Sequence, residues 1–154
     1  ALHGAFPHSY TNIETLGLDI YFFGEDDYIS FVSAVSPQRN PGLTVWQIYS
    51  VADEGVYLSL VPAFSDDPTE RLSESEPTLI LANYSAEFSY QELNEDRVCF
   101  DEWSGNEELS LPLAVYVRFI PDRDYEDVNE ELEIVARIKN NQHRSIRPTT
   151  NVGL

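Results

Sequence analysis

The sequence predicts a mainly β fold in which two antiparallel β-sheets pack together within a single globular domain. Apolar and polar residues alternate in short runs, which is the pattern of half-buried strands. Nine prolines and seven glycines are spread among these runs, and no window longer than about ten residues keeps the helical period. A length of 154 residues suffices for one sizeable core and is short for two. About eight short strands in one domain are typical of two packed sheets.

The N-terminal part contains the least regular pattern and then the first clear strand. Within residues 1–27 the apolar residues alternate only weakly, at Leu16, Leu18, Ile20 and Phe22. A strand follows, on which Ile29, Phe31 and Val35 share one face. The segment 37–42 contains two prolines and a glycine, so we expect this strand to end there.

Residues 45–51 and 56–61 are predicted to form a β-hairpin. Both runs are rich in β-branched and aromatic residues, and Asp-Glu-Gly at 53–55 suits the turn between them. The next segment, 62–77, contains three prolines and few apolar residues. We therefore expect a polar loop that lies over the surface and adds nothing to the core.

The remaining strands are expected in the second half of the chain. Their apolar alternation places them at 79–81, 86–90, 98–100, 113–120 and 132–138. The last strand alternates strictly, at Leu132, Ile134, Ala136 and Ile138. The predicted domain comprises residues 1–138. Residues 139–154 lack apolar periodicity, and we expect them to be a flexible or cloning-derived tail.

The chain is strongly acidic, with 27 acidic and nine basic residues and a formal net charge of −18. All 27 carboxylates precede Lys139, so residues 1–138, with six basic side chains, carry −21 and residues 139–154 carry +3. Such a field repels phosphate backbones and anionic lipid headgroups. We therefore expect neither nucleic acid nor an acidic membrane surface as a partner.

The sequence contains no established motif of catalysis or cofactor binding. It has no glycine-rich phosphate loop, no GxSxG and no HExxH. His3, His8 and His143 all lie near the termini, where a catalytic base lacks rigid support. Cys99 is the only cysteine, which excludes an intrachain disulfide and a thiolate metal site, and we expect it to be a small buried hydrophobe. We predict no catalytic residue, no cofactor and no enzymatic activity.

Carboxylates are grouped at several places, and two kinds of site are considered for them. Asp122, Asp124 and Asp127 lie in the connection between two predicted strands, where clustered oxygen ligands suit Ca²⁺. Because the glycine and the closing glutamate of an EF-hand are missing, we favour a charged hairpin tip over a calcium site. Pairs such as those at 25–27 and 101–102 are candidates for an acid-pair hydrolase, which needs two carboxylates about 5 Å apart across a cleft.

Three aromatic residues, Trp46, Tyr49 and Tyr57, are candidates for a sugar-binding platform. Trp46 and Tyr49 are three positions apart, so they face opposite sides of a straight strand. We expect core packing for at least one of them. A secreted carbohydrate-binding β-sandwich is therefore one alternative for the function, and an acid-pair hydrolase is a further one.

The chain also contains a specific order of parts. A strand within LILANYSAEFSYQE is followed by Trp103 in EWSG and then by LPLAVYVRF, which carries Arg118. Upstream lie YISFVSAV and the hairpin of LTVWQIYSV and GVYLSLVP, and downstream lies ELEIVARI. This arrangement, over residues 24–138, resembles the J-type minor pseudopilin of the bacterial type II secretion system.

The resemblance implies a structural role. Members of that family begin with a hydrophobic helix, processed by a prepilin peptidase, that anchors them in the bacterial inner membrane, so the full-length fold is α+β. Their globular domain lies in the periplasm. This chain lacks the helix, so we expect membrane contact only through a segment that it does not contain. The implied partners are other minor pseudopilins, in a hetero-oligomeric complex at the pseudopilus tip that supports protein secretion.

Overall fold

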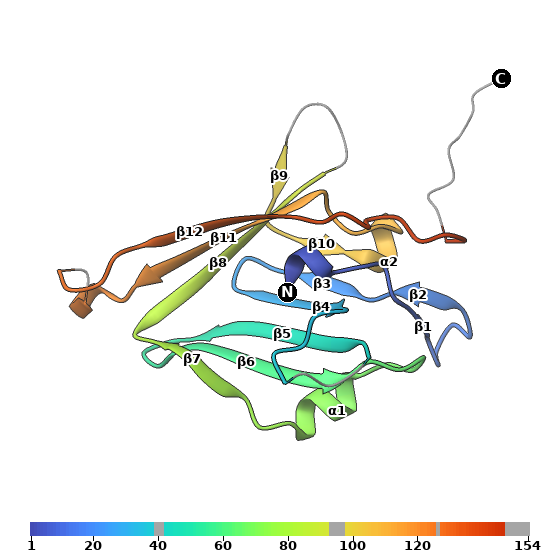
Figure 1. Cartoon of the computed structure of the whole chain (residues 1–154), viewed down its shortest axis with the longest axis horizontal. Helices are drawn as coiled ribbons and strands as arrows, with labels where there is room; N and C mark the ends of the chain where they lie inside the picture. Colours follow the sequence, from blue (N-terminus) through green and yellow to red (C-terminus); the bar gives the residue numbers. More distant parts are fainter. Residues whose placement is uncertain (39–41, 93–97, 126, 147–154) are drawn as a thin grey trace.

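A computed structural model shows that the chain folds mainly into antiparallel β-sheets (Figure 1). The structure describes residues 1–38, 42–92, 98–125 and 127–146. One sheet has six strands, in the order β10-β3-β4-β5-β6-β7, and a second has four, in the order β12-β11-β8-β9. The prediction of a mainly β fold with two packed antiparallel sheets is confirmed.

The six-stranded sheet comes from residues 22–82, apart from one short later strand. Its members are β3 (Phe22–Gly24), β4 (Tyr28–Ser33), β5 (Thr44–Val51), β6 (Gly55–Pro62), β7 (Thr78–Ala82) and β10 (Trp103–Ser104). The predicted hairpin is confirmed as β5 and β6, with Val51 paired to Gly55. Gly55 has a φ of +148°, and a Cβ atom there would meet the carbonyl oxygen of Leu81. Glycine suits this turn because it adopts this φ without strain and has no Cβ atom to clash with Leu81.

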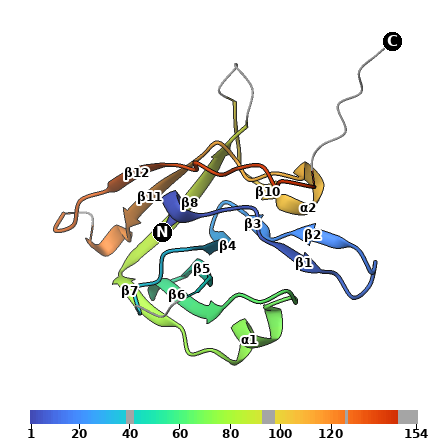
Figure 2. The same cartoon turned by 45° about the vertical axis from the view of Figure 1, so that its right-hand side comes forward.

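The four-stranded sheet comes from the second half of the chain. Its members are β8 (Tyr84–Gln91), β9 (Cys99–Phe100), β11 (Ala114–Pro121) and β12 (Leu132–Arg137). The chain passes from β7 into β8 at Asn83, whose φ of 63° lies in the left-handed region that asparagine tolerates. Figures 1 and 2 both show β8, β11 and β12 lying across the six-stranded sheet.

The helices are short, as the weak helical periodicity indicates. They are η1 (Leu2–Gly4), α1 (Thr69–Glu74), α2 (Gly105–Glu108) and η2 (Arg123–Tyr125). In the irregular N-terminal segment, β1 (Ser9–Thr11) and β2 (Leu18–Ile20) form a separate two-stranded sheet. No helix in the described part of the chain is long and apolar enough to cross a membrane.

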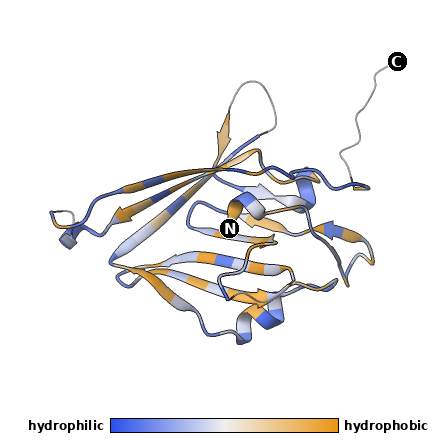
Figure 3. Ribbon diagram, in the orientation of Figure 1, coloured by the Kyte–Doolittle hydropathy of each residue, from blue (hydrophilic) through white to orange (hydrophobic). Residues whose placement is uncertain are grey.

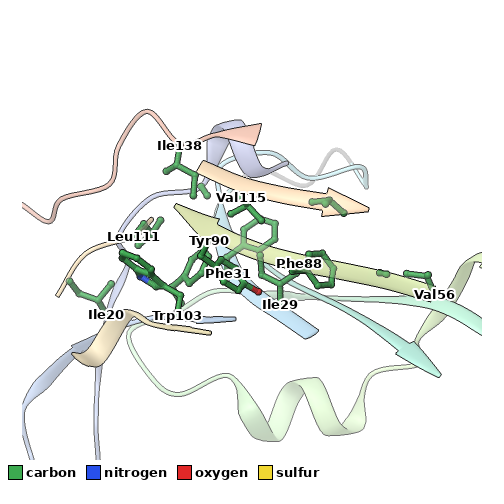
Figure 4. Packing of buried hydrophobic residues seen from close by; sticks show 14 residues of the cluster. Ile20, Ile29, Phe31, Val56, Phe88, Tyr90, Trp103, Leu111, Val115 and Ile138 are labelled. Carbon is green, nitrogen blue, oxygen red and sulfur yellow. The ribbon is translucent and has the colours of Figure 1, made fainter. Parts of the chain in front are cut away.

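The main core lies between the two large sheets (Figure 4). On β8 the alternating residues Ala86, Phe88 and Tyr90 are buried, as predicted. Trp103, which follows them in the chain, is 6% exposed and joins the same cluster. The other buried members are Ala5, Ile20, Phe22, Ile29, Phe31, Val56, Leu111, Val115, Val117 and Ile138.

A second cluster lies on the opposite face of the six-stranded sheet, and it corrects the prediction for residues 62–77. Its buried members are Tyr10, Tyr21, Val32, Val45, Val61 and Leu72. Leu72 belongs to α1, inside the segment that was expected to be a surface loop without core residues. That prediction was wrong because a helix of under two turns needs only one apolar residue to bury against a sheet, too few for a periodic signal.

Cys99, which was predicted to be buried, and Val35, which was predicted to share a strand face with Ile29 and Phe31, are both exposed. Val35 is 48% exposed because β4 ends at Ser33, so the alternation of Ile29 and Phe31 does not continue to it. Cys99 is also exposed, because β9 is a two-residue edge strand paired only with the end of β8. Figure 1 shows β9 projecting away from the body of the domain.

Strand β12 is an edge strand with an apolar surface. Of its strictly alternating residues, Ala136 and the following Ile138 are buried, whereas Leu132 and Ile134 are 44% and 50% exposed. Figure 3 shows hydrophobic colouring along β12, and Figure 1 shows the β11–β12 hairpin extending beyond the six-stranded sheet. The alternation therefore predicts the strand correctly, but only two of the four alternating apolar residues are buried in the domain.

The segment after Ile138 makes contacts with the domain as far as the structure describes it. The amide of Leu111 donates a hydrogen bond to the carbonyl oxygen of Asn141 at 2.8 Å, and Gln142 forms a β-bridge with Ser110. Ile146 packs against the main cluster. The packed chain thus reaches residue 146 of the predicted tail, and residues 147–154 lie outside the described part.

Candidate functional site

A groove on the outer face of the six-stranded sheet, the face turned away from the four-stranded sheet, is the candidate site. It consists of two adjoining open hollows, which we call the outer groove. The first has a volume of about 500 Å³ and is lined by Glu25, Asp27, Tyr28, Gln47, Tyr49 and Ser50. The second has about 470 Å³ and is lined by Tyr21, Phe23, Glu25, Tyr28, Gln47, Thr69, Leu72 and Ser73. Three residues, Glu25, Tyr28 and Gln47, line both.

The register of β4 and β5 brings the polar and aromatic side chains of the groove together. Tyr28 lies opposite Tyr49, and Ser30 lies opposite Gln47. Directly opposed residues point to the same side of a sheet, so Tyr28 and Tyr49 share the outer face, as does Gln47, two positions from Tyr49. The side-chain amide of Gln47 donates a hydrogen bond to the hydroxyl of Tyr28 at 2.9 Å. This bond holds the Tyr28 ring at the edge of the groove.

Tyr49 and Tyr57 form a stacked pair beside the groove. Tyr57 lies opposite Tyr49 on β6, and the ring centroids are 5.9 Å apart with an interplanar angle of 17°. The hydroxyl of Tyr57 donates a hydrogen bond to the Glu54 carboxylate, which raises the pKa of the Tyr57 phenol. Because the two rings cover one face of each other, they do not form the flat platform predicted for sugar binding.

Trp46 lies on the other side of β5. Its ring stacks on Phe31 at a centroid distance of 6.2 Å, and its indole N–H donates a hydrogen bond to the carbonyl oxygen of Val35 at 2.9 Å. It packs against the main core cluster. The prediction that Trp46 and Tyr49 face opposite sides, with one of them in the core, is confirmed.

The turn between β3 and β4 supplies the two carboxylates of the groove, and β8 holds this turn in place. The Tyr90 hydroxyl donates hydrogen bonds to the carbonyl oxygens of Glu25, at 2.8 Å, and Tyr28, at 3.2 Å. The Phe88 amide donates to the carbonyl oxygen of Asp26 at 2.7 Å. Burial, with the neighbouring carboxylates, raises the pKa of Tyr90 well above its usual range, so its hydroxyl stays a donor.

The electrostatic character of the groove is acidic. Glu25 and Asp27 are its charged lining residues, and none of the described lining residues is basic. Arg71 of α1 is nearby in the chain, but its guanidinium binds Asp66 at 2.8 Å and lies 4.9 Å from the Phe64 ring centroid. The groove therefore presents aromatic rings and negative charge without an internal counter-ion among the residues that line it.

The calcium candidate is not supported by geometry. In the described part of the chain, no group of three or more His, Cys, Asp or Glu side chains is placed to hold a metal ion. Asp122, Asp124 and Asp127 belong to this part and lie in the connection between β11 and β12, around η2. The charged hairpin tip thus remains the favoured interpretation.

The acidic pairs at 25–27 and 101–102 meet at one open hollow of about 660 Å³ beside Trp103. Its carboxylates are Glu25, Asp101, Glu102, Glu107 and Glu108, and all five residues are exposed. An acid-pair hydrolase needs two carboxylates at a fixed distance across a cleft. This open hollow with exposed carboxylates does not provide such a cleft, so the hydrolase alternative gains no support from it.

The three histidines contact the main chain. His3 Nδ1 donates to the carbonyl oxygen of Arg137 at 3.1 Å, and His8 Nε2 donates to that of Phe64 at 2.7 Å. His143 Nδ1 accepts the amides of two following residues. These bonds stabilise loops and the N-terminal segment.

Comparison with known proteins does not assign the chain to a family. No protein-family model matches it, and no curated protein matches it. The resemblance to J-type pseudopilins therefore stays a prediction, carried by the order of strands and by the residues quoted for it.

Proposed function

We propose that this chain is the globular domain of a J-type minor pseudopilin, a non-enzymatic subunit that assembles with other minor pseudopilins at the pseudopilus tip. The observation that carries the proposal is the unit formed by β8, Trp103 and β11. β8 and β11 pair antiparallel from Tyr84 opposite Pro121 to Gln91 opposite Ala114. This is the part of the chain in which the resemblance is most specific.

The connection between β8 and β11 is closely packed around Trp103 and Gly105. Its Trp103 side chain is buried and donates a hydrogen bond from the indole N–H to the carbonyl oxygen of Ser110 at 2.9 Å. Gly105 packs so closely that a Cβ atom there would come within 2.7 Å of the carbonyl oxygen of Ile20. The connection is thereby held together internally and packed against β2, and β10 pairs with β3, which suits a subunit whose function depends on a stable shape.

The surface supports assembly through charge. Carboxylates dominate the domain, and charge complementarity selects partners and suppresses unwanted association. A pseudopilin domain of this kind would lie in the periplasm, joined to the inner membrane by its N-terminal helix.

The test is assembly with the minor pseudopilins encoded beside this chain. We expect the purified chain to form a stoichiometric complex with at least one of their globular domains, detected by size-exclusion chromatography with light scattering. The full reading frame should also encode a short basic leader, a glycine cleavage site and about 20 apolar residues with an early glutamate. A different beginning of the reading frame, or failure to bind any neighbouring pseudopilin, would contradict the proposal.

A carbohydrate-binding β-sandwich is the second candidate, because Tyr28 and Tyr49 line an open hollow that also contains carboxylates. It predicts measurable binding to a polysaccharide that is lost when Tyr49 is changed to alanine. Glycan arrays without a hit would exclude it.

A further inference from the structure

Tyr49 stacks on Tyr57 and also lines the outer groove. β5 lies between β4 and β6 in the sheet. Tyr57, on β6, stacks on Tyr49 from that side. Tyr28, on β4, lies opposite Tyr49 from the other side, and the hollow of about 500 Å³ is lined by both Tyr28 and Tyr49. The hollow is thus a slot bordered by two phenol rings.

The walls of this slot combine ring faces with carboxylates. Glu25 and Asp27 line it together with Gln47. Gln47 uses its amide N–H on the Tyr28 hydroxyl. A ligand for such a slot needs a flat surface to stack on a ring and donors to reach a carboxylate.

A guanidinium group meets both requirements. It is planar, stacks on aromatic rings and donates paired hydrogen bonds to carboxylates. A lysine ammonium carries the same charge, but it cannot stack on a ring or form paired hydrogen bonds with a carboxylate. A neutral sugar does not use the negative charge of the slot.

We propose that the outer groove binds an arginine side chain from a basic segment of a partner protein, with the guanidinium stacked on Tyr49 and paired with Glu25 or Asp27. Charge complementarity favours this occupant, because no basic side chain lines the slot among the described residues and residues 1–138 carry −21. The turn that carries both carboxylates is held by Tyr90, so the slot is organised before binding. The proposal depends on the groove alone and does not require the chain to be a pseudopilin.

The probes are short Gly-Ser peptides that carry arginines, with matched peptides that carry lysines or glutamates in their place. Binding to the full chain is followed by NMR titration, with the Gln47 side-chain amide and the backbone amides of β4 and β5 as reporters. We expect the arginine peptide to bind about fivefold more tightly than the lysine peptide. The glutamate peptide should not bind, and added salt should weaken the arginine peptide.

Variants of the chain then locate the site. Tyr49→Ala should weaken the arginine peptide about fivefold, whereas Tyr116→Ala, which removes a partly buried tyrosine from the four-stranded sheet, should leave its affinity unchanged. The double change Glu25→Gln and Asp27→Asn keeps the shape of the slot and should weaken binding by about threefold. Glu70→Gln on α1 removes an exposed charge outside the groove lining and is its control.

The outcomes separate this proposal from others. Equal affinity for arginine and lysine peptides, or affinity unchanged by the double carboxylate change, would overturn it. Binding of cello- or xylo-oligosaccharides with loss in Tyr49→Ala, but no binding of the arginine peptide, would replace it with the carbohydrate-binding function. If Tyr49→Ala unfolds the domain, the affinity of the double carboxylate variant for the arginine peptide still tests the proposal. Loss of pseudopilin assembly with retained arginine binding would reject the proposed function and leave this inference standing.

Discussion

The Tyr90 hydroxyl donates a hydrogen bond of 2.8 Å to the carbonyl oxygen of Glu25, a residue 65 positions earlier in the chain. Tyr90 belongs to the four-stranded sheet, and Glu25 begins the turn between two strands of the six-stranded sheet. The bond therefore joins the two layers at the place where the outer groove has its carboxylates. The stability of the core and the shape of the groove depend on the same side chain.

Replacing Tyr90 with phenylalanine should test this link. The change removes the donor to the carbonyl oxygens of Glu25 and Tyr28 and keeps the ring, so we expect a loss of about 1–2 kcal/mol in the free energy of unfolding. Urea denaturation measures it. The control variant Tyr116→Phe, at a partly buried position, loses only a long hydrogen bond, of 3.4 Å, to Gln91, and should change the unfolding free energy by about 0.5 kcal/mol or less. Equal effects of the two changes would show that the Tyr90 hydroxyl does not hold the turn.

Buried tyrosines should make the domain sensitive to alkali. Burial raises the pKa of Tyr21 and Tyr90 in the folded state well above the ordinary value. The unfolded chain therefore releases these protons first, from about pH 10 upward. Stability is fully present below about pH 10, and it decreases as the pH rises toward the folded pKa, by at most about 1.4 kcal/mol per pH unit for each tyrosine.

Urea midpoints at about pH 9 and pH 11 measure this dependence. The control is Tyr21→Phe combined with Tyr90→Phe, which is less stable near neutral pH but should lose less stability between the two pH values. A double variant with the same alkaline loss as the wild type would refute the assignment.

Gly24 should not tolerate a side chain. A Cβ atom at this position would overlap the ring of Tyr90, and since Tyr90 is fully buried, the ring has no free space to move into. We expect Gly24→Ala to destabilise the domain by about 1–3 kcal/mol, measured by thermal or urea unfolding. Gly17→Ala is the control, because the Thr15 hydroxyl at 3.4 Å is the only atom a Cβ atom would meet there. A stable Gly24→Ala variant would mean that the two layers can separate at little cost.

Trp103 should contribute more to stability than Trp46. Trp103→Phe removes a buried indole and the donor to Ser110, which should lower the free energy of unfolding by about 2–4 kcal/mol. Trp46 is only partly buried, so Trp46→Phe should lower it by about half as much. Fluorescence distinguishes the two tryptophans, because each single variant leaves only one of them to emit. The Trp46→Phe variant, which retains the buried Trp103, should emit at a shorter wavelength than the Trp103→Phe variant, which retains Trp46. The reverse order of stabilities would argue against Trp103 as the anchor of the connection between β8 and β11.

The strands could be predicted because their signal is local. The hairpin of β5 and β6 is visible in its alternating residues and its Asp-Glu-Gly turn, and the buried face of β8 follows from Ala86, Phe88 and Tyr90. The helix α1 gave no comparable signal, since Leu72 is its one buried residue. The exposure of Cys99 depends on β9 being an edge strand, which alternation does not report.

The groove could be predicted only in part. Tyr49 and Tyr57 stood out as aromatic residues on adjacent strands, but Tyr28 and Gln47 carried no motif. They meet Tyr49 because β4 pairs with β5 in one register. In the sequence, nothing distinguishes Glu25 and Asp27 from the other acidic groups. Their position in the groove follows from the hydrogen bonds of the Tyr90 hydroxyl, which hold the turn that carries them.

By itself, the sequence determined that this chain is mainly β, acidic and without a known catalytic motif, because periodicity and composition are properties of neighbouring residues. Tertiary structure alone decided which apolar faces are covered and which rings and carboxylates come together. These outcomes depend on strand pairing and on contacts between residues far apart in the chain. The bond from Tyr90 to Glu25 is such a contact, and it places the charged turn of the groove, which the local pattern left undetermined.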